Sequence, residues 1–216
     1  MKSVKARMML MILLASYAAS AQTKIGLTAG ATFANVMVKS EGISGSPKEK
    51  TGFTAGLLVN APLSSNFCFQ PALNFVQKGY IVKDQTGTEK AMINYLEVPL
   101  NFIYTVNKEA GFFIGAGPSF SYGISGTDKF TFSSNGMPPT SDKINFGKGA
   151  EEVKPFDMGA NILAGYLFRG GFLISGNYNF GLSKINNDDG SGGDGTIKNR
   201  YFAIKLGYMF GGDKRK

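Results

Sequence analysis

The sequence predicts an all-β fold, an eight-stranded antiparallel up-and-down transmembrane β-barrel with short periplasmic turns and long extracellular loops. Three observations support this prediction. Eight segments of about ten to fourteen residues alternate between bulky apolar and small polar side chains. The polar positions hold mostly glycine, serine, threonine and asparagine rather than charged residues, and the connections between segments are alternately short and long.

Each predicted strand is bounded by turn-forming residues and repeats its aromatic and aliphatic side chains at every second position. The pattern is clearest in 111–124, where Phe112 and Ile114 alternate with Gly115 and Gly117. A period of two places the two sets on opposite faces of a strand. The predicted strands are 24–34, 51–63, 67–80, 92–106, 111–124, 156–168, 171–183 and 198–210.

A soluble barrel or sandwich also alternates, so the content of the less apolar face decides between the two classes. A water-facing strand carries charged residues, whereas here most of the charge lies in the connections. We therefore expect the bulky face to meet lipid and the small polar face to line a narrow lumen. This places Ile114, Phe120, Ile174 and Leu206 toward lipid, and Asn177 toward the lumen.

The connections predict which rim of the barrel faces the periplasm. Outer-membrane barrels have short periplasmic turns and longer extracellular loops, and an even strand number returns both ends to one side. Tyr104, Tyr166 and Tyr208 fall on the bulky face near the short-turn side, where an aromatic girdle belongs. The short connections are 64–66, 107–110 and 169–170, and the long ones are 35–50, 81–91, 125–155 and 184–197.

The first 21 residues have the three parts of a secretory signal peptide: a basic start, a short apolar run, and Ala19-Ser20-Ala21 before a cleavage site. The apolar run is too short to cross a hydrocarbon core of ~30 Å as a helix. We therefore expect a signal peptide at 1–21 and an outer-membrane β-barrel domain at 22–216, with Gln22 as the first residue of the mature protein.

The formal net charge of +8 falls to about +5 without the signal peptide, a mild excess that favours contact with the phosphates of lipopolysaccharide. No stripe of basic residues is interleaved with aromatic ones, so nucleic acid is not expected as a partner. Cys68 is the only cysteine, which excludes an intrachain disulfide. We expect it to be a small packed side chain.

The chain contains no histidine, which excludes a Ser-His-Asp hydrolase and a histidine-ligated zinc site. We expect no enzymatic activity, no cofactor and no metal centre. The Asp- and Gly-rich loop 186–195 has oxygen ligands that could surround Ca²⁺, but its spacing does not fit an EF-hand. The composition favours a solvated hairpin tip and leaves calcium binding open.

Four charged residues fall on the polar face of the predicted strands. Their signs balance, and an eight-stranded barrel is only wide enough to be filled by side chains. We therefore expect internal ion pairs that neutralise one another, with a gated or ion-conducting path as the alternative. These candidate lumen charges are Lys78, Glu97, Asp157 and Lys205.

The longest connection, 125–155, is rich in apolar residues and is the candidate binding loop, because long loops of this kind are commonly functional. Its residues 130–132 are predicted to extend the fifth strand above the membrane. Binding of an extracellular ligand is the leading interpretation, and a bare spacer or a cover over the lumen is the alternative. The candidate binding residues are Phe130, Phe132, Met137 and Phe146.

Several motifs carry a resemblance to a known family. The most specific is Tyr95-Leu96-Glu97-Val98-Pro99-Leu100, and the others are Gly26-Leu27-Thr28-Ala29-Gly30, Gln77-Lys78-Gly79, Gly115-Ala116-Gly117-Pro118 and Gly207-Tyr208-Met209-Phe210. With these motifs the mature chain resembles the Bacteroidota outer-membrane protein β-barrel domain family, also called the porin family or PorT family. The resemblance implies an exported eight-stranded barrel in a Gram-negative cell envelope, inserted by the outer-membrane barrel assembly machinery.

Three functions follow as hypotheses. The first is a structural or interaction protein that acts through its extracellular loops on an extracellular ligand or envelope protein. The second is a narrow transport pore. The third, implied by the resemblance to the PorT family, is a component of an envelope secretion machinery.

Overall fold

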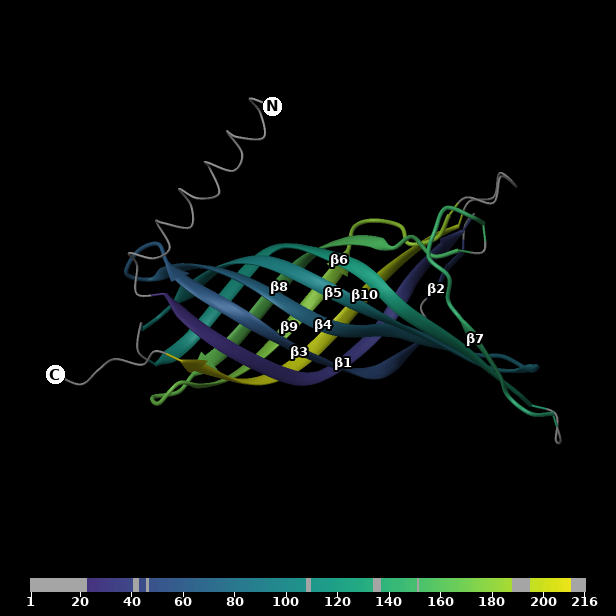
Figure 1. The fold of residues 1–216 in the computed structure, drawn as a ribbon, viewed down its shortest axis with the longest axis horizontal. Coiled ribbons are helices and arrows are strands. Elements are labelled where there is room, and N and C mark those ends of the chain that lie inside the picture. Colours follow the sequence, from purple (N-terminus) through teal and green to yellow (C-terminus); the bar gives the residue numbers. More distant parts are fainter. Residues whose placement is uncertain are drawn as a thin grey trace, which may run out of the picture.

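The computed structural model describes residues 23–40, 43–45, 47–107, 110–133, 137–150, 152–187 and 195–210, and these form one antiparallel sheet that closes on itself (Figure 1). The predicted signal peptide lies outside the described residues. Within them, no helix has the length and apolar character needed to span a bilayer.

Eight strands form the barrel, in chain order around the ring, and β10 pairs with β1 to close it. This confirms the predicted fold class. The barrel strands are β1 (Lys24–Ser40), β3 (Lys48–Pro62), β4 (Phe67–Lys83), β5 (Gly87–Thr105), β6 (Gly111–Phe132), β8 (Phe156–Leu167), β9 (Phe172–Gly181) and β10 (Thr196–Phe210). Two short strands, β2 (Ile43–Gly45) and β7 (Thr140–Lys143), pair with β1 and β6 outside the ring.

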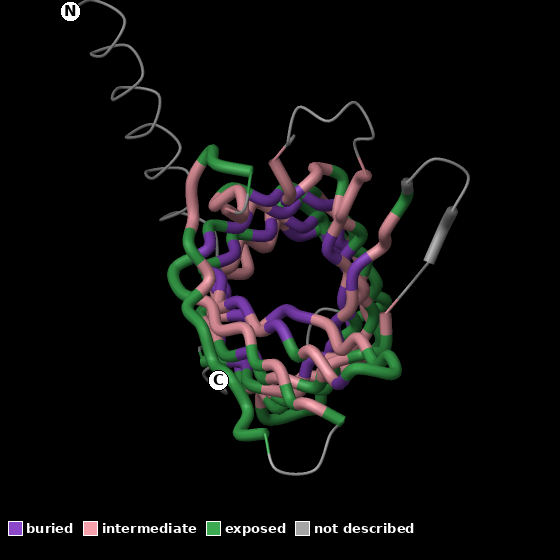
Figure 2. Tube along the Cα trace, turned by 90° about the vertical axis from the view of Figure 1, so that its right-hand side faces the viewer, coloured by how far each residue is buried: buried purple, intermediate pink, exposed green. Residues whose placement is uncertain are grey.

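Buried and more exposed positions largely alternate along the barrel strands, as the colours of the trace show (Figure 2). Ile114 and Leu206 are 60% and 65% exposed, whereas Asn177 and Glu97 are 4% and 1% exposed. Exposed bulky residues and buried polar ones invert the pattern of a soluble protein. The facing predicted from the sequence is confirmed.

The short-turn end of the barrel carries paired aromatic rings on its outer surface. Tyr208 and Phe172 are in edge contact with ring centroids 5.0 Å apart, and Tyr104 contacts Phe67 at 5.2 Å. The tight turn before β9 uses Gly170 at a φ of 98°, a conformation that favours glycine. The predicted tyrosine positions therefore contribute to an aromatic girdle at this rim.

The strands extend further on the long-loop side than the sequence predicts. Residues 81–91 were expected to be a long loop, but β4 continues to Lys83 and β5 begins at Gly87. Asp84 closes the turn between them, because its carboxylate accepts hydrogen bonds from the Thr86 hydroxyl and from the Thr86 and Gly87 amides. These bonds lower the pKa of the Asp84 carboxyl.

The strand extensions build a twisted sheet that projects beyond the barrel, at the right of Figure 1. We call it the extracellular sheet. It contains the predicted extension at 130–132, which pairs with β5 on one side and, at Phe130, with β7 on the other. It comprises residues 48–50 of β3, 79–83 of β4, 87–94 of β5, 125–132 of β6 and 140–143 of β7.

A charge should be tolerated unequally along the outer surface. Leu206→Arg, on the outward face of β10 in mid-strand, is expected to reduce the free energy of folding into bilayers by about 2–4 kcal/mol. Thr88→Arg, also outward but in the extracellular sheet, should change it by less than about 0.5 kcal/mol. Denaturant titration into phospholipid vesicles measures both, and equal losses would contradict the assigned lipid face.

Candidate functional site

The middle of the lumen is occupied by a buried ion-pair cluster centred on Lys78. The Lys78 Nζ atom of β4 lies 3.1 Å from Glu97 Oε2 of β5 and 3.1 Å from Asp157 Oδ2 of β8. It also donates a hydrogen bond of 3.0 Å to Ser121 Oγ of β6. All four side chains are buried, so one ammonium links β4 to its neighbour β5 and to β6 and β8 further around the ring.

Two tyrosines and an asparagine complete what we call the lumen network. Tyr201 donates a hydrogen bond to Glu97 Oε1, and Asn199 Nδ2 donates to Asp157 Oδ2 at 2.9 Å and to Tyr95 Oη at 3.2 Å. The Lys78 ammonium lies 4.7 Å from the ring centroid of Tyr95 and 5.4 Å from that of Tyr201. The network is defined as Lys78, Tyr95, Glu97, Ser121, Asp157, Asn199 and Tyr201.

Every carboxylate oxygen of the network has a partner, which is the condition under which buried charge is tolerable. Glu97 Oε2 also accepts from Ser121 at 3.1 Å, and Asp157 Oδ1 accepts from the Ser183 hydroxyl at 3.2 Å. Such complete satisfaction makes the cluster rigid. It is therefore suited to seal the lumen rather than to move ions through it.

Three of the four predicted lumen charges are brought together, and the fourth is not. Lys205 points into the lumen beside Glu97, but among the described residues no carboxylate lies within 4 Å of its ammonium. The expectation that all four neutralise one another directly is therefore wrong for Lys205. Alternation shows that a side chain faces inward, but it does not fix the height at which that side chain meets its neighbours.

Below the network, toward the short-turn rim, the lumen holds a chain of amides. Asn177 donates to Asn161 at 3.1 Å, and Asn161 donates to Asn101 at 3.0 Å. A cavity of about 40 Å³ lies between these amides and Lys205, and the buried Asn177 Oδ1 has no protein partner there. A cavity of this size and polarity has room for about one water molecule.

A wider vestibule of about 280 Å³ opens at the short-turn rim. Its wall combines apolar side chains, such as Ile103, Phe113 and Met209, with polar ones near Lys24 and Asn60. Cys68 lines the same space as a buried thiol. The vestibule therefore lies below the amide chain, at the short-turn end of the lumen.

On the extracellular side, the loop after β7 folds over the mouth of the barrel. The Phe146 ring occupies the space that a side chain at Gly123 would need, and Ile144 lies over Gly126 in the same way. Asn187 fastens this loop by donating to the carbonyls of Gly149 at 2.9 Å and Glu152 at 2.8 Å. Of the interpretations of residues 125–155, a cover over the lumen fits the part of the loop that contains Ile144 and Phe146.

The four candidate loop residues separate into two groups. Phe146 packs over Gly123 and is committed to the cover. Phe130 and Phe132 lie in the extracellular sheet with their rings 4.9 Å apart, and Met137 is 60% exposed. Only the second group lies outside the cover over the lumen.

No metal site is found in the part of the chain that the structure describes: no group of three or more His, Cys, Asp or Glu side chains is close enough to hold an ion. The candidate calcium loop 186–195 lies mostly outside the described residues. Of its described residues, Asn186 binds the Gly195 carbonyl and the Ile197 amide within its own hairpin.

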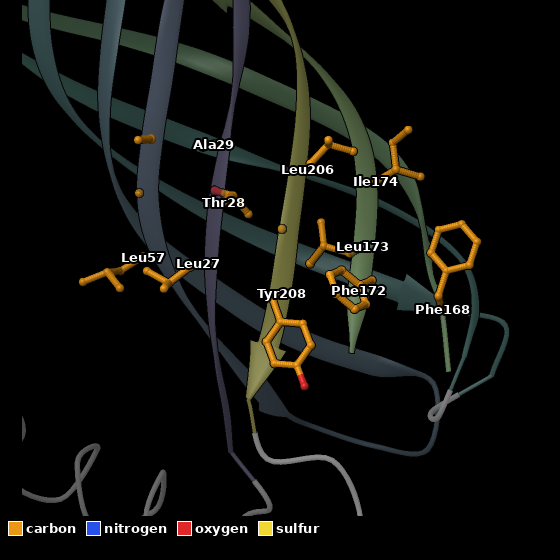
Figure 3. A pocket seen from close by; sticks show the side chains of 13 residues that line it. Leu27, Thr28, Ala29, Leu57, Phe168, Phe172, Leu173, Ile174, Leu206 and Tyr208 are labelled. Carbon is orange, nitrogen blue, oxygen red and sulfur yellow. The ribbon is translucent and has the colours of Figure 1, made fainter. Parts of the chain in front are cut away.

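A surface groove of about 920 Å³ lies on the outside of the barrel (Figure 3). It runs over Ala29 and Ala55 between larger neighbours such as Leu57, Leu206 and Phe172. Its walls are mostly apolar, and its large exposed side chains, such as Leu57, Phe172 and Leu206, belong to the outward face of the strands. We assign it to the lipid-contacting surface.

The family model described as "Outer membrane protein beta-barrel domain" matches residues 18–187. Among solved structures, the chain is similar to Ail, the attachment invasion locus protein of Yersinia pestis (17% identity, 87% of this chain and 98% of that chain covered, TM-score 0.46). It is also similar to Neisserial surface protein A (14%, 86% and 95%, 0.43) and to OprG from Pseudomonas aeruginosa (12%, 88% and 96%, 0.40). No curated protein sequence matches the chain.

Removing the central ammonium should be costly, because it leaves two buried carboxylates facing each other. Lys78→Met is expected to reduce the free energy of unfolding by about 3–5 kcal/mol. The triple variant K78M/E97Q/D157N removes all three charges and should recover most of that loss. Denaturant unfolding of the refolded barrel measures both, and equal stability of the Lys78→Met and triple variants would contradict the network.

Proposed function

Because the chain belongs to the family of outer membrane protein β-barrel domains, we propose that it is a non-conducting outer-membrane protein that presents its extracellular sheet to a partner outside the cell. The observation that carries the proposal is the contrast between the two halves of the molecule. The lumen is bridged by a buried ion-pair network, whereas the strands continue well beyond the barrel as an exposed sheet.

The side chains that bridge the lumen argue against transport. A solute entering from outside meets first the cover around Phe146 and then the network around Lys78. Water-filled channels occur in barrels with about sixteen strands, whereas eight strands leave room only for side chains. A narrow transport pore is therefore the less favoured function.

The extracellular sheet offers two features to a partner. Strand β7 pairs with β6 on one side, and among the described residues no strand pairs with its other edge. An open edge can accept a strand from another chain. Near it lie the paired rings of Phe130 and Phe132, which supply apolar contact area.

Export belongs to the same proposal. We propose that residues 1–21 direct secretion, that the mature chain begins at Gln22, and that the barrel assembly machinery of a Gram-negative envelope inserts it. The motif of residues 95–100 resembles the Bacteroidota members of the family and supports a source in that group.

The resemblance to the PorT family also raises a role in a secretion machinery, but the barrel itself accounts for the motif that carries this resemblance. Tyr95 and Glu97 belong to the lumen network, and Leu96 and Val98 face outward on the lipid side. The motif therefore supports the fold of the lumen and gives no separate support to this third function.

The purified monomer should conduct poorly in planar bilayers, because the network and the cover close the lumen. We expect no stable open level, while a sixteen-stranded general porin in the same bilayers gives large conductance. Stable single-channel conductance, together with sugar uptake into liposomes, would move transport to first place.

Contacts outside the cell can be mapped by photo-crosslinking on intact cells. A photoreactive phenylalanine analogue at Phe132, in the extracellular sheet, should form adducts with a partner that mass spectrometry identifies. The same analogue at Ser65, in the periplasmic turn, is the matched control and should not capture that partner. Failure of Phe132 to form any adduct, when the surface-exposed protein is folded, would count against the display function.

A further inference from the structure

The extracellular sheet separates its charges by face. Residues paired directly across an antiparallel sheet point to the same side, and one such row runs Lys48, Ile81, Lys90, Lys129 and Ser141. The adjacent row, pointing the other way, runs Glu49, Tyr80, Ala91, Asp128 and Asp142.

The second row is the inner one. Ala91 is 3% exposed and lies two positions from Ile93, which pairs with the lumen residue Lys78. The lysine row is therefore directed outward, on the same side as the lipid-facing residues lower in the strands. Lys83 and Lys143 are on this outer face by the same pairing.

Lys50 lies at the β3 bulge, where its partner on β1 is the inward-facing Ala34, but its side chain extends to the outer face of β4. Its aliphatic chain lies beside Gly79, which is on the outer face of β4. Partial burial and the nearby ammonium groups of Lys90 and Lys129 lower the pKa of Lys50. We call this set the lysine face: Lys48, Lys50, Lys83, Lys90, Lys129 and Lys143.

The lysine face has no acidic residue at any outward position of the described sheet, and no described carboxylate lies within 4 Å of its ammonium groups. The carboxylates of the sheet, at Glu49, Glu89, Asp128 and Asp142, all point inward. Lys90 and Lys129 lie directly opposite each other, an arrangement that is unfavourable without a counter-charge. The described residues supply no such counter-charge, which leaves this face open to an external anion.

Two β-bulges produce the segregation. In β6, Gly123 pairs with Tyr95 but Ser125 pairs with Asn94, so one extra residue is inserted and every later side chain changes face. A similar shift in β3 falls between Glu49 and Thr54. Without these bulges the alternation would turn Lys129 inward and Glu49 outward.

The height of the lysine face selects the kind of anion. The outward apolar band ends at Leu96 in β5, and Lys90 lies six residues higher, which is about 14 Å at ~3.3 Å per residue and ~45° tilt. The headgroup layer of a phospholipid is only about 5–7 Å deep. A headgroup that reaches the upper lysines must be taller and must carry phosphates above the first sugars.

We propose that the lysine face binds the phosphorylated saccharide headgroup of an outer-leaflet glycolipid, a lipopolysaccharide, and so holds the extracellular sheet against the membrane surface. The outward direction of the lysines and their continuity with the lipid-facing band favour a membrane-anchored anion over a soluble one. The inner face and the β7 edge remain available to a separate partner, so this proposal does not depend on the display function.

The test uses the full chain refolded in detergent micelles and a rough lipopolysaccharide with a phosphorylated core. The variant K50Q/K90Q/K129Q removes three charges from the lysine face, and K24Q/K148Q/K154Q removes three charges elsewhere. We expect the first to weaken binding on the order of 100-fold, since each lysine near an anionic surface contributes about a factor of five. The second should match the wild type.

Three further arms make the result decisive. The charge-conserving variant K50R/K90R/K129R should retain binding, and heat-modified gel mobility should show that every variant is folded. Enzymatically dephosphorylated lipopolysaccharide should bind the wild type as weakly as the intact form binds the triple Gln variant. Equal binding of the two Gln variants, equal binding of both lipopolysaccharides, or a lysine-dependent preference for dextran sulfate over lipopolysaccharide would each overturn the proposal.

Discussion

The structure depends on the closure of a narrow ring in hydrocarbon. No water is available there to bond backbone amides and carbonyls, so a sheet can cross only if it has no free edge. The pairing of β1 with β10 provides that closure without interruption, from Ile25 opposite Phe210 to Lys39 opposite Thr196. Alternation follows directly, because each strand then has one face toward lipid and one toward a lumen too narrow for bulk water.

The narrow lumen in turn explains why its charges are arranged as a network. A buried ammonium or carboxylate is costly unless paired and fully hydrogen-bonded. Lys78 meets this condition with two carboxylates, a hydroxyl and two tyrosine rings contributed by four strands. Lys205 does not, and it lies next to the small polar cavity where a water molecule can hydrate it.

The sequence was sufficient to predict the eight strands and their facing, because alternation is a local property that each segment carries by itself. It was insufficient above the membrane. Residues 81–91 contain Lys83, Asp84, Glu89 and Lys90, a polarity that is typical of a loop, yet they form strands once water faces both sides of the sheet. Above the membrane, lipid no longer requires apolar side chains on one face of the strands. The alternation that identifies strands in the sequence is therefore lost there.

The lumen network was only partly predictable, since alternation identifies inward residues but not their relative heights. Those heights depend on the stagger between neighbouring strands. The stagger is set only when all eight strands close into the barrel. The cover was only the alternative interpretation of its loop, for a related reason. Phe146 was a candidate binding residue, but its place over Gly123 requires contacts between a loop and a strand that no local pattern encodes.

The two bulges link these parts of the molecule. Within the barrel, strict alternation is enforced because an inserted residue would turn apolar side chains into the lumen. Just above the apolar band, a change of face no longer turns apolar side chains into the lumen. The extra residue there, Ile124, therefore costs only one position without a partner on β5. It reverses the face of every later residue in β6, which brings Lys129 outward beside Lys90 and Asp128 inward. The same polypeptide thus presents apolar groups to hydrocarbon and cations to the layer above it, and the change occurs at the height where the surroundings change.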